Sequence, residues 1–454
     1  MMTRPGDEPD RRGWPEVLGL HRPELRAWAL YDWAVSGWQT MILTTLFPVY
    51  YYEVAGAGLP QGVAIERFAA ATALSVAVVA IVSPVLGAIA DRLAARKMLL
   101  GACVGLGGLA TAGMSQVRPG DLTLATVLFV AAYLGASGSL VFYDALLLHV
   151  ARPEEVDRVS TVGHALGYLG GGLLLALDLA WVALPRWFGF TPEDPTALAR
   201  WAFLSVAAWW LAFSIPLFRR VAEPAAVPGP GERPARGLLI DAITRLGGSF
   251  RRLLGLRQAA LMLVAFLVYQ AGVETIQKMA AIFGREVGLD DLALMTTLLA
   301  VQFVGIPFAV LFGMLAGRIG AKLSILVALA AYVAVSVLGY FLTSLAQFVL
   351  VALLVGMVRG GCQALSRSLY ACLVPARESA MFFGLFAVAE KLAGALGPGA
   401  FALTTAATGS SRRAVGALVL FFLVGGAVLA SVDVRRGQAL ARTAQVSDLP
   451  AEAG

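Results

Sequence analysis

Residues 87–100 read Gly-Ala-Ile-Ala-Asp-Arg-Leu-Ala-Ala-Arg-Lys-Met-Leu-Leu, and residues 313–326 read Gly-Met-Leu-Ala-Gly-Arg-Ile-Gly-Ala-Lys-Leu-Ser-Ile-Leu. The second stretch is a degenerate copy of the first, about half a chain length further on. Each is a short, charged turn, led by glycine, between two long hydrophobic runs. A repeat of this kind indicates a membrane protein built from two parallel halves, and proteins built this way commonly move solutes across the bilayer.

The composition points to the same class of protein. Hydrophobic residues make up 59% of the chain and charged residues 14%, whereas about 25% of the residues of a soluble domain are charged. The three cysteines all fall in apolar runs, so we expect small buried side chains rather than disulfides or zinc ligands. The three histidines are far apart and lack metal-ligand spacing. We therefore expect no metal site and no cofactor.

Twelve segments are long and apolar enough to cross a membrane, which requires about 20 residues of helix. Helices are expected because an open sheet cannot satisfy its backbone hydrogen bonds in lipid. The predicted fold is an all-α integral membrane protein with 12 transmembrane helices in two pseudo-symmetric six-helix bundles. The predicted spans are 27–52, 68–90, 98–116, 122–150, 162–186, 201–218, 259–284, 292–316, 321–342, 346–373, 381–406 and 413–432.

One clear boundary divides the chain. Four prolines with intervening glycines in residues 222–237 predict an irregular linker. The next stretch, 238–257, mixes apolar residues with arginines, which suits a helix in the membrane interface or a solvated connector. The predicted organisation is an N-terminal tail (1–26), a first bundle (27–221), a linker (222–258), a second bundle (259–432) and a C-terminal tail (433–454).

The positive charges predict the orientation. Most of the 35 lysines and arginines fall in the tails and loops on the side that holds both termini, so that side is expected to be cytosolic. This bias explains the formal charge of +6 without a nucleic-acid partner. The first apolar run exceeds a signal-peptide core and is expected to be its own insertion signal. The excess of arginine over lysine is typical of proteins encoded by GC-rich bacterial genomes. We therefore expect a multi-pass protein of a bacterial inner (plasma) membrane.

Several charged side chains fall inside the spans, where each costs at least a few kcal/mol unless it is paired or hydrated. Counting about 1.5 Å of rise per residue places Glu274, Arg359 and Glu390 in the middle of the bilayer. Lys278 follows Glu274 at i+4, which allows an ion pair, and Lys391 adjoins Glu390 but points elsewhere. Arg359 either binds a carboxylate of the ligand through its planar fork or neutralises Glu274 or Glu390.

Asp32 and Asp144 lie closer to the cytosolic ends of the first and fourth spans. One interpretation is a gate, or an acidic pair that couples transport to protons. The other is that both acids form hydrogen bonds to a neighbouring loop. The residues alone favour the second interpretation without excluding the first.

The glycine-led turn resembles the signature loop of the major facilitator superfamily. Gly87, Asp91, Arg92 and Arg96 match its pattern, whereas Gly317 replaces the acid in the second copy. The resemblance implies that both turns act as cytosolic gate loops; a plain cluster of topogenic charges is the alternative. The residues assigned to these loops are Gly87, Asp91, Arg92, Arg96, Gly313, Arg318 and Lys322.

Further motifs resemble the family of fungal vacuolar amino-acid effluxers linked to autophagy and their bacterial relatives, over about residues 26–433. They include Tyr31-Asp32-Trp33-Ala34, Phe47-Pro48-Val49-Tyr50, Phe142-Tyr143-Asp144-Ala145, Gly360-Gly361-Cys362-Gln363 and Phe382-Phe383-Gly384-Leu385-Phe386. The superfamily lines its central cavity with helices 1, 4, 7 and 10, which implies that Glu274, Lys278, Arg359 and Gln363 lie near the substrate. The family usually has Asn at Val35, an acid at Ala271 and Gln at Arg359, so this chain departs from it at those positions.

The fifth span carries Gly163, Gly167 and Gly171 at a spacing of four, which predicts a smooth face for close helix packing. The surrounding run is similar to the helix 5 motif of proton-driven exporters, except that Tyr168 replaces proline. This similarity slightly favours export.

Together these features predict a secondary active transporter, and not an enzyme, that exports a small organic solute by alternating access around a central site. Amino acids or similar small organic solutes are the expected substrates, transport is expected to be linked to protons or driven by another gradient, and a monomer in the lipid bilayer is the expected form. A lipid or drug exporter of the same fold is the main alternative. A membrane enzyme is disfavoured because the chain has no nucleophile elbow and no clustered histidines, and a receptor-like sensor because no sizeable soluble domain is visible. Without a phosphate-binding loop, ATP drive within this chain is not expected.

Overall fold

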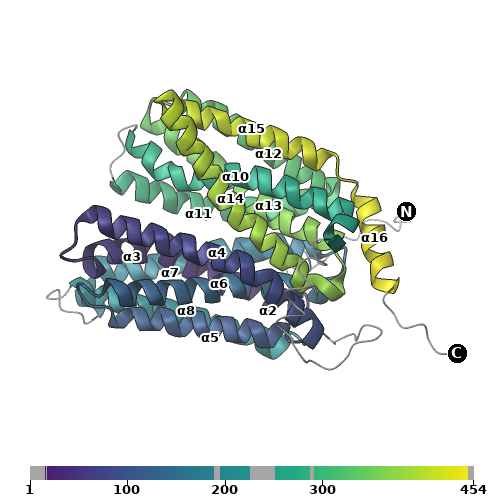
Figure 1. Cartoon of the computed structure of the whole chain (residues 1–454), viewed down its shortest axis with the longest axis horizontal. Helices are drawn as coiled ribbons and strands as arrows, with labels where there is room; N and C mark the ends of the chain where they lie inside the picture. Colours follow the sequence, from purple (N-terminus) through teal and green to yellow (C-terminus); the bar gives the residue numbers. More distant parts are fainter. Residues whose placement is uncertain (1–15, 17, 189–194, 225–250, 287–290, 448–454) are drawn as a thin grey trace, which may run out of the picture.

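The computed structural model describes residues 16, 18–188, 195–224, 251–286 and 291–447. Within these ranges the regular structure is helical, and the helices form two bundles that lie side by side (Figure 1). The first bundle contains α2 (Pro23–Trp38), α3 (Leu46–Tyr50), α4 (Gln61–Leu93), α5 (Arg96–Gly113), α6 (Leu122–Val150), α7 (Val156–Ala183) and α8 (Pro195–Arg220). The second contains α10 (Arg257–Glu286), α11 (Asp291–Ile319), α12 (Ala321–Tyr340), α13 (Leu345–Leu373), α14 (Ser379–Thr408) and α15 (Ser411–Ala430).

Eleven helices of the described residues are long and apolar enough to cross a membrane. The remaining predicted span, 27–52, is not one regular helix, so the prediction of a single regular segment is wrong in this detail. Here α2 and α3 are joined by the π-helix Gln39–Thr45, and α3 continues into a second π-helix, Tyr51–Ala55. Pro48 has no N–H to donate to the carbonyl of Thr44. The loss of this α-helical hydrogen bond favours a locally wider helix at this point.

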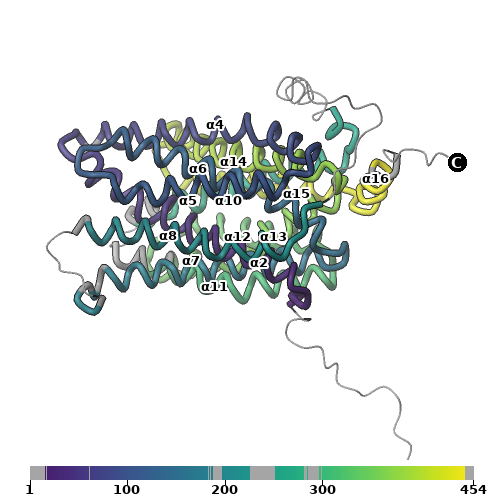
Figure 2. Tube along the Cα trace, turned by 90° about the horizontal axis from the view of Figure 1, so that it is seen from below, coloured from purple at the N-terminus to yellow at the C-terminus, as the bar shows by residue number. Residues whose placement is uncertain are grey.

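The C-terminal tail, predicted only as a tail, contains a further helix, α16 (Val434–Ser447). It lies beyond the ends of the bundle helices in both views (Figures 1 and 2) and packs against α10 and α13. Gly437 is buried against Leu373 and Gln258, and Ala441, four residues on, is also buried. The segment is too polar and too short to be predicted as a membrane span, so the sequence did not indicate this helix. Most of the interfacial helix predicted at 238–257 falls outside the described residues.

We call the end of the molecule where α4 and α8 finish and α5 starts the basic end, because Arg92, Arg96, Lys97, Arg219 and Arg220 lie there. The two halves meet closely at this end. A Cβ on Gly384 of α14 would lie 2.7 Å from the Cα of Pro84 in α4. Gly87 similarly abuts the backbone of Ala380, and Gly313 of α11 abuts Thr161 of α7. The basic end is therefore closed by helices from opposite halves, with backbone against backbone where α4 meets α14 and a threonine side chain against glycine where α7 meets α11.

Candidate functional site

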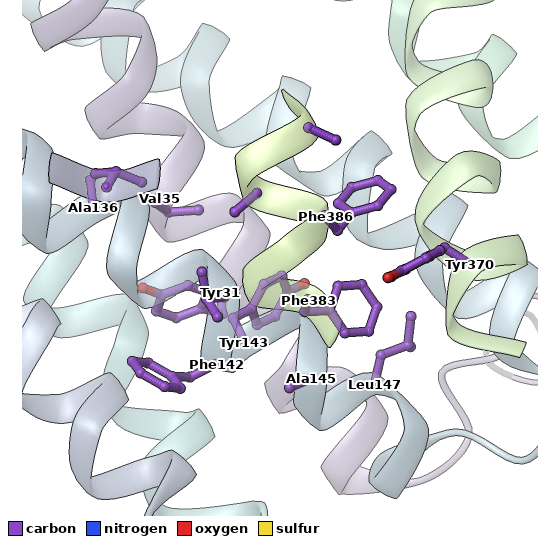
Figure 3. Packing of buried hydrophobic residues seen from close by; sticks show 14 of the residues in the cluster. Tyr31, Val35, Ala136, Phe142, Tyr143, Ala145, Leu147, Tyr370, Phe383 and Phe386 are labelled. Atoms are coloured by element: carbon purple, nitrogen blue, oxygen red, sulfur yellow. The ribbon is translucent and has the colours of Figure 1, made fainter. Parts of the chain in front are cut away.

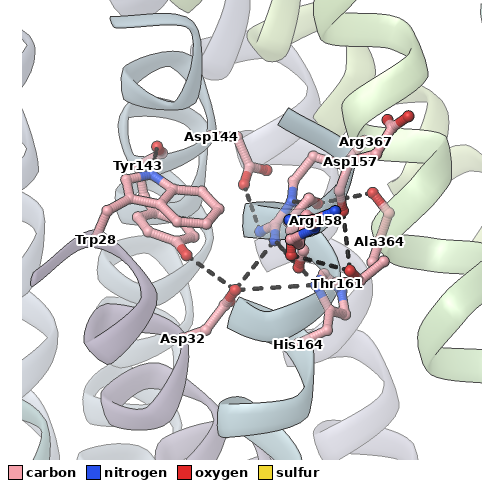
Figure 4. A network of polar contacts seen from close by, with 11 residues as sticks. Trp28, Asp32, Tyr143, Asp144, Asp157, Arg158, Thr161, His164, Ala364 and Arg367 are labelled. Carbon is pink, nitrogen blue, oxygen red and sulfur yellow. Dashed lines mark hydrogen bonds and ion pairs between the residues drawn. The ribbon is translucent and has the colours of Figure 1, made fainter. Parts of the chain in front are cut away.

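Arg367 connects the two halves near the basic end. It lies on α13, less than two turns from the end of that helix, and its side chain is buried. One terminal nitrogen, Nη1, donates to Asp144 of α6 at 3.0 Å, and the other, Nη2, donates to Asp32 of α2 at 3.1 Å (Figure 4). Both carboxylates belong to the first bundle and the arginine to the second. These ion pairs therefore hold the halves together across the interface.

Helix α7 supplies further partners for Arg367. Its Nε donates to Ser160 Oγ at 3.0 Å, and Nη2 lies 3.1 Å from the Ser160 carbonyl and 3.0 Å from Nδ1 of His164. Arginine has no acceptor, so Nδ1 accepts this bond and the ring proton of His164 lies on Nε2. We call Arg367, Asp32, Asp144, Ser160 and His164 the Arg367 cluster.

Aromatic rings cover the Arg367 cluster. The guanidinium carbon lies 4.9 Å from the ring centre of Trp28 and 5.5 Å from that of Tyr143. These two rings stack on each other at 4.5 Å, and the Tyr143 hydroxyl donates to Asp32 at 2.8 Å. Cation–π attraction and the exclusion of water strengthen the charged contacts beneath them. Tyr143 also belongs to a buried hydrophobic cluster that includes Phe383 and Phe386 of α14 (Figure 3).

The three glycines of α7 bring Asp32 within reach of this cluster. Cβ atoms on Gly163 and Gly167 would lie 2.7 Å from Asp32 Oδ2 and 2.5 Å from Ser36 Oγ, both on α2. Gly171 lies against Thr40 in the same way. The missing side chains let α2 and α7 approach closely, so that Asp32 and α7 surround the same guanidinium.

The first glycine-led turn also crosses between the halves. Asp91 accepts hydrogen bonds from the backbone N–H groups of Ala380 at 3.1 Å and Met381 at 2.8 Å, in the first turn of α14. The buried Arg96 lies 2.7 Å from the same carboxylate and donates to the carbonyl of Arg377. A carboxylate at a helix N-terminus satisfies free N–H groups and interacts favourably with the helix dipole. Asp91 thus caps a helix of the other half.

The second turn makes a different set of contacts. Gly313 touches Thr161 of the other half, but Gly317, in the place of the acid, has open space around its Cβ position. Arg318 is exposed. Lys322 donates to carbonyls at the end of α15, at 2.6 and 2.7 Å, inside its own half. The two turns are therefore unequal, and the first carries the charged contacts between halves. Arg92, next to Asp91, is partly buried at the end of α4.

The acids predicted in the middle of the bilayer pair with lysines. Glu274 and Lys278 lie 3.5 Å apart on α10, and Lys278 also donates to the Gly394 carbonyl of α14. Glu390 and Lys391 are 3.3 Å apart on α14, so the expectation that Lys391 points away from its neighbour is wrong. The ammonium of Lys391 lies 5.6 Å from the ring centre of Tyr133 on α6, in the other half.

Arg359 differs from the other charges of this region. Among the residues that the structure describes, no carboxylate pairs with it, and its buried Nε has no hydrogen-bond partner. Its guanidinium lies 5.9 Å from the ring centre of Tyr168 on α7. Gln363 lies one turn further along α13 and is partly buried. Arg359 thus neutralises neither Glu274 nor Glu390 in this conformation, and that alternative is wrong for it.

Sequence reasoning missed part of this arrangement. Arg367 is absent from the intramembrane charges singled out above, although it falls inside the predicted span 346–373, and its depth in that span was the available signal. The expectation that Asp32 and Asp144 bond to a neighbouring loop is wrong, because both meet Arg367 of a transmembrane helix. Asp178 of α7 was also overlooked; it is buried and accepts a bond from Ser205 of α8 within the first half.

Comparison with known proteins gives consistent matches. A family model described as vacuole effluxer Atg22 like matches residues 21–156 and 149–442. The uncharacterized MFS-type transporter YxiO of Bacillus subtilis is 32% identical over 93% of this chain and 97% of its own length. Autophagy-related protein 22 of Yarrowia lipolytica is 27% identical over 63% of this chain, which spans about half (52%) of the fungal protein. The structure of the proton:xylose symporter XylE superposes with a TM-score of 0.66 over 94% of this chain and 99% of XylE, at 13% identity.

Proposed function

The chain belongs to the Atg22-like vacuole effluxer family of major facilitator superfamily transporters, and from this premise we propose that it exports amino acids or similar small carboxylates by alternating access. It is a multi-pass membrane transporter and not an enzyme. Arg359 supports the assignment of the substrate, and the family description and the glycine motif of α7 support the direction.

Arg359 supports a ligand with a carboxylate. A cation without a partner in a membrane-spanning helix is costly, and an anionic group that arrives with the substrate would offset that cost. The planar guanidinium can form two parallel hydrogen bonds with a carboxylate, and the ring of Tyr168 lies beside it. Glu274 and Glu390, which are predicted at a similar depth in the bilayer, are partly exposed and could receive the ammonium group of an amino acid.

The closed basic end supports a conformational cycle. If the basic end faces the cytosol, as the positive charges predict, this conformation is closed to the cytosol. Opening the contacts between α4 and α14 and between α7 and α11 would then admit solute from the cytosol. The family description as effluxers and the glycine motif of α7 support export rather than uptake.

Counterflow tests the proposal. The full chain is reconstituted in proteoliposomes, and exchange of a radiolabelled mixture of the common amino acids is measured. We expect exchange by the wild type and a loss of apparent affinity of about tenfold or more in Arg359→Lys, because a bidentate charged contact is lost. Arg412→Lys, at an exposed position near the start of α15, is the matched control and should exchange normally.

Two results would oppose the proposal. Equal affinities of Arg359→Lys and the wild type for every carboxylate would remove Arg359 as the ligand group. Exchange of amphiphilic dyes or lipids, but not of amino acids, would favour the lipid or drug exporter instead.

A further inference from the structure

We propose that the ring of Tyr168 competes with the substrate for one notch beside Arg359. The ring fills the notch while the basic end is closed, and an apolar, ring-sized group of the substrate fills it while that end is open. The proposal rests on the proposed transport function and adds the part of the substrate that is recognised and the residue that displaces it. It is argued from the packing of α7 against α11 and α13.

Two glycines of the second half form this notch. A Cβ on Gly360 of α13 would lie 2.5 Å from Cε2 of the Tyr168 ring, and a Cβ on Gly305 of α11 would lie 3.1 Å from the same atom. Both distances are shorter than the roughly 3.5–4.0 Å of an ordinary carbon contact, so the ring occupies space that two side chains would otherwise fill. Ala309, one turn beyond Gly305, bounds the same space. We call this space the glycine notch.

The ring and the glycine notch belong to opposite halves. Tyr168 lies on α7 of the first bundle, whereas α11 and α13 pack against each other in the second. Thr161, about two turns closer to the basic end on α7, touches Gly313 of α11. When the halves rock apart at the basic end, α7 moves away from α11 and takes the ring with it, but the two glycines stay together in one half. The notch is therefore free only while the basic end is open.

The glycine notch lies where a substrate held by Arg359 would place its side chain. The centre of the Tyr168 ring marks the notch, and it is 5.9 Å from the guanidinium carbon of Arg359. A carboxylate bound by two hydrogen bonds has its carbon about 4 Å from the guanidinium carbon. In an aromatic amino acid, ordinary bond lengths place the ring centre about 5 Å from the carboxylate carbon. These three distances close a triangle, so one molecule can bind Arg359 and fill the notch.

The chemistry of the glycine notch selects an apolar ring. Gly305, Gly360 and Ala309 have no polar side-chain atoms, so a group that enters the notch gains by leaving water in proportion to its apolar area. The guanidinium beside the notch adds cation–π attraction to an aromatic ring. A small amino acid can bind Arg359 but gains nothing from the notch. We therefore expect the transporter to prefer aromatic amino acids over small ones.

Competition for the glycine notch makes the affinity differ between the two sides of the membrane. As the basic end closes, the ring of Tyr168 returns to the notch and displaces the ring of the substrate, which then keeps only its contacts to Arg359. Binding is thus tighter in the state that is open at the basic end than in the state that is closed there. Tight binding at the basic end and weaker binding at the other suit the proposed export.

The first arm of the test measures the selectivity of exchange in proteoliposomes, as the ratio of the apparent affinities for labelled L-phenylalanine and labelled L-alanine. Tyr168→Ala removes the competing ring, so we expect this ratio to rise about tenfold. Adding Gly360→Ala narrows the glycine notch and should abolish the rise. The double variant avoids the clash of Gly360→Ala with the ring, because the nearest remaining atom is then the Cβ of Ala309 at 3.3 Å.

The matched control puts Gly105→Ala into the Tyr168→Ala background. Nothing lies within 4 Å of the Cβ position of Gly105 on α5, so this variant should keep the rise in selectivity. An unchanged ratio in Tyr168→Ala would overturn the proposal. A rise that persists after Gly360→Ala is added would overturn it as well, because the ring of the substrate would then bind elsewhere.

The second arm measures binding without transport. A ligand that binds the folded protein raises the midpoint of thermal unfolding in detergent. L-Phenylalanine should raise the midpoint more in Tyr168→Ala than in the double variant with Gly360→Ala, whereas L-alanine should raise both equally. Equal shifts with L-phenylalanine would overturn the proposal even if neither variant transports. Absence of counterflow in the wild type, with the expected shifts present, would instead count against the proposed function alone.

Discussion

Arg367 and Arg359 lie two turns apart on one helix, yet their surroundings differ sharply. Arg367 has two carboxylates, a serine and a histidine around its three nitrogens, with two rings over its plane. Arg359 has one ring and no acid among the described residues. A buried guanidinium is stable only when its donors are satisfied, so the first is suited to holding the structure together and the second to receiving a ligand.

This contrast predicts that substitutions of the two arginines affect different properties, closure of the basic end for Arg367 and substrate affinity for Arg359. In Arg367→Lys the compact ammonium cannot reach Asp32, Asp144 and Ser160 at once, and a buried polar group without a partner costs about 1–3 kcal/mol. Thr161 is fully buried between the halves, so a Thr161→Cys variant, with the three native cysteines replaced by alanine, reports opening of the basic end to a maleimide. In Arg367→Lys this labelling should increase about tenfold. Arg359→Lys should leave that labelling rate unchanged while it weakens amino-acid exchange. Equal effects of both variants on labelling would contradict the separation of roles.

At the scale of elements, the closed basic end depends on glycines at helix crossings. Gly384 of α14 faces the backbone of Ser83 and Pro84 in α4, where a Cβ would come within 2.7 Å. Gly399 lies on the same helix, and nothing lies within 4 Å of its Cβ position. Backbone cannot move aside as the tip of a flexible side chain does, so only the first position requires glycine in this conformation.

A pair of alanine substitutions tests this point. Gly384→Ala should destabilise the protein by about 1–3 kcal/mol through overpacking, seen as a lower midpoint of thermal unfolding in detergent. A thiol-reactive dye can follow the unfolding, because the native Cys362 is buried. Gly399→Ala, which is also a better helix former, should unfold at or slightly above the wild-type temperature. Equal midpoints for the two variants would mean that α4 and α14 do not pack as described.

At the scale of the whole molecule, the duplicated turns have diverged in what they hold. The first places Asp91 on the N-terminus of α14 in the other half. The second has Gly317 at the equivalent place and uses Lys322 to bind carbonyls of its own half. The charged contacts that close the basic end therefore come from the first turn and the Arg367 cluster.

Two variants of the turns test the asymmetry. Asp91→Asn keeps the shape of the side chain but removes the charge that caps α14, which we expect to cost about 1 kcal/mol or more of the closed state. Labelling of Thr161→Cys should rise in this variant. Arg318→Gln, in the exposed part of the second turn, should leave labelling unchanged. Equal increases in both variants would show that the turns act symmetrically.

The sequence by itself determined the class of protein and the plan of its fold. Long apolar runs must be helical in lipid, because each backbone group needs a partner within its own segment, and the half-length repeat with its basic turns divides the helices into two bundles. Apolar runs, repeats and loop charges can all be read from the order of the residues, without knowledge of which segments pack together. The resemblance to the effluxer family likewise rested on contiguous motifs.

Only the tertiary structure decided which charges meet. Asp32 and Asp144 are 335 and 223 residues from Arg367, and their encounter depends on the glycine face of α7 and on the closure of the basic end. The same packing leaves Arg359 without an acid, although Glu274 and Glu390 lie at similar depth. Depth along a helix follows from the sequence, but the direction of a side chain and its neighbours depend on how helices pack. Pairing energies between distant residues exist only once that packing has formed.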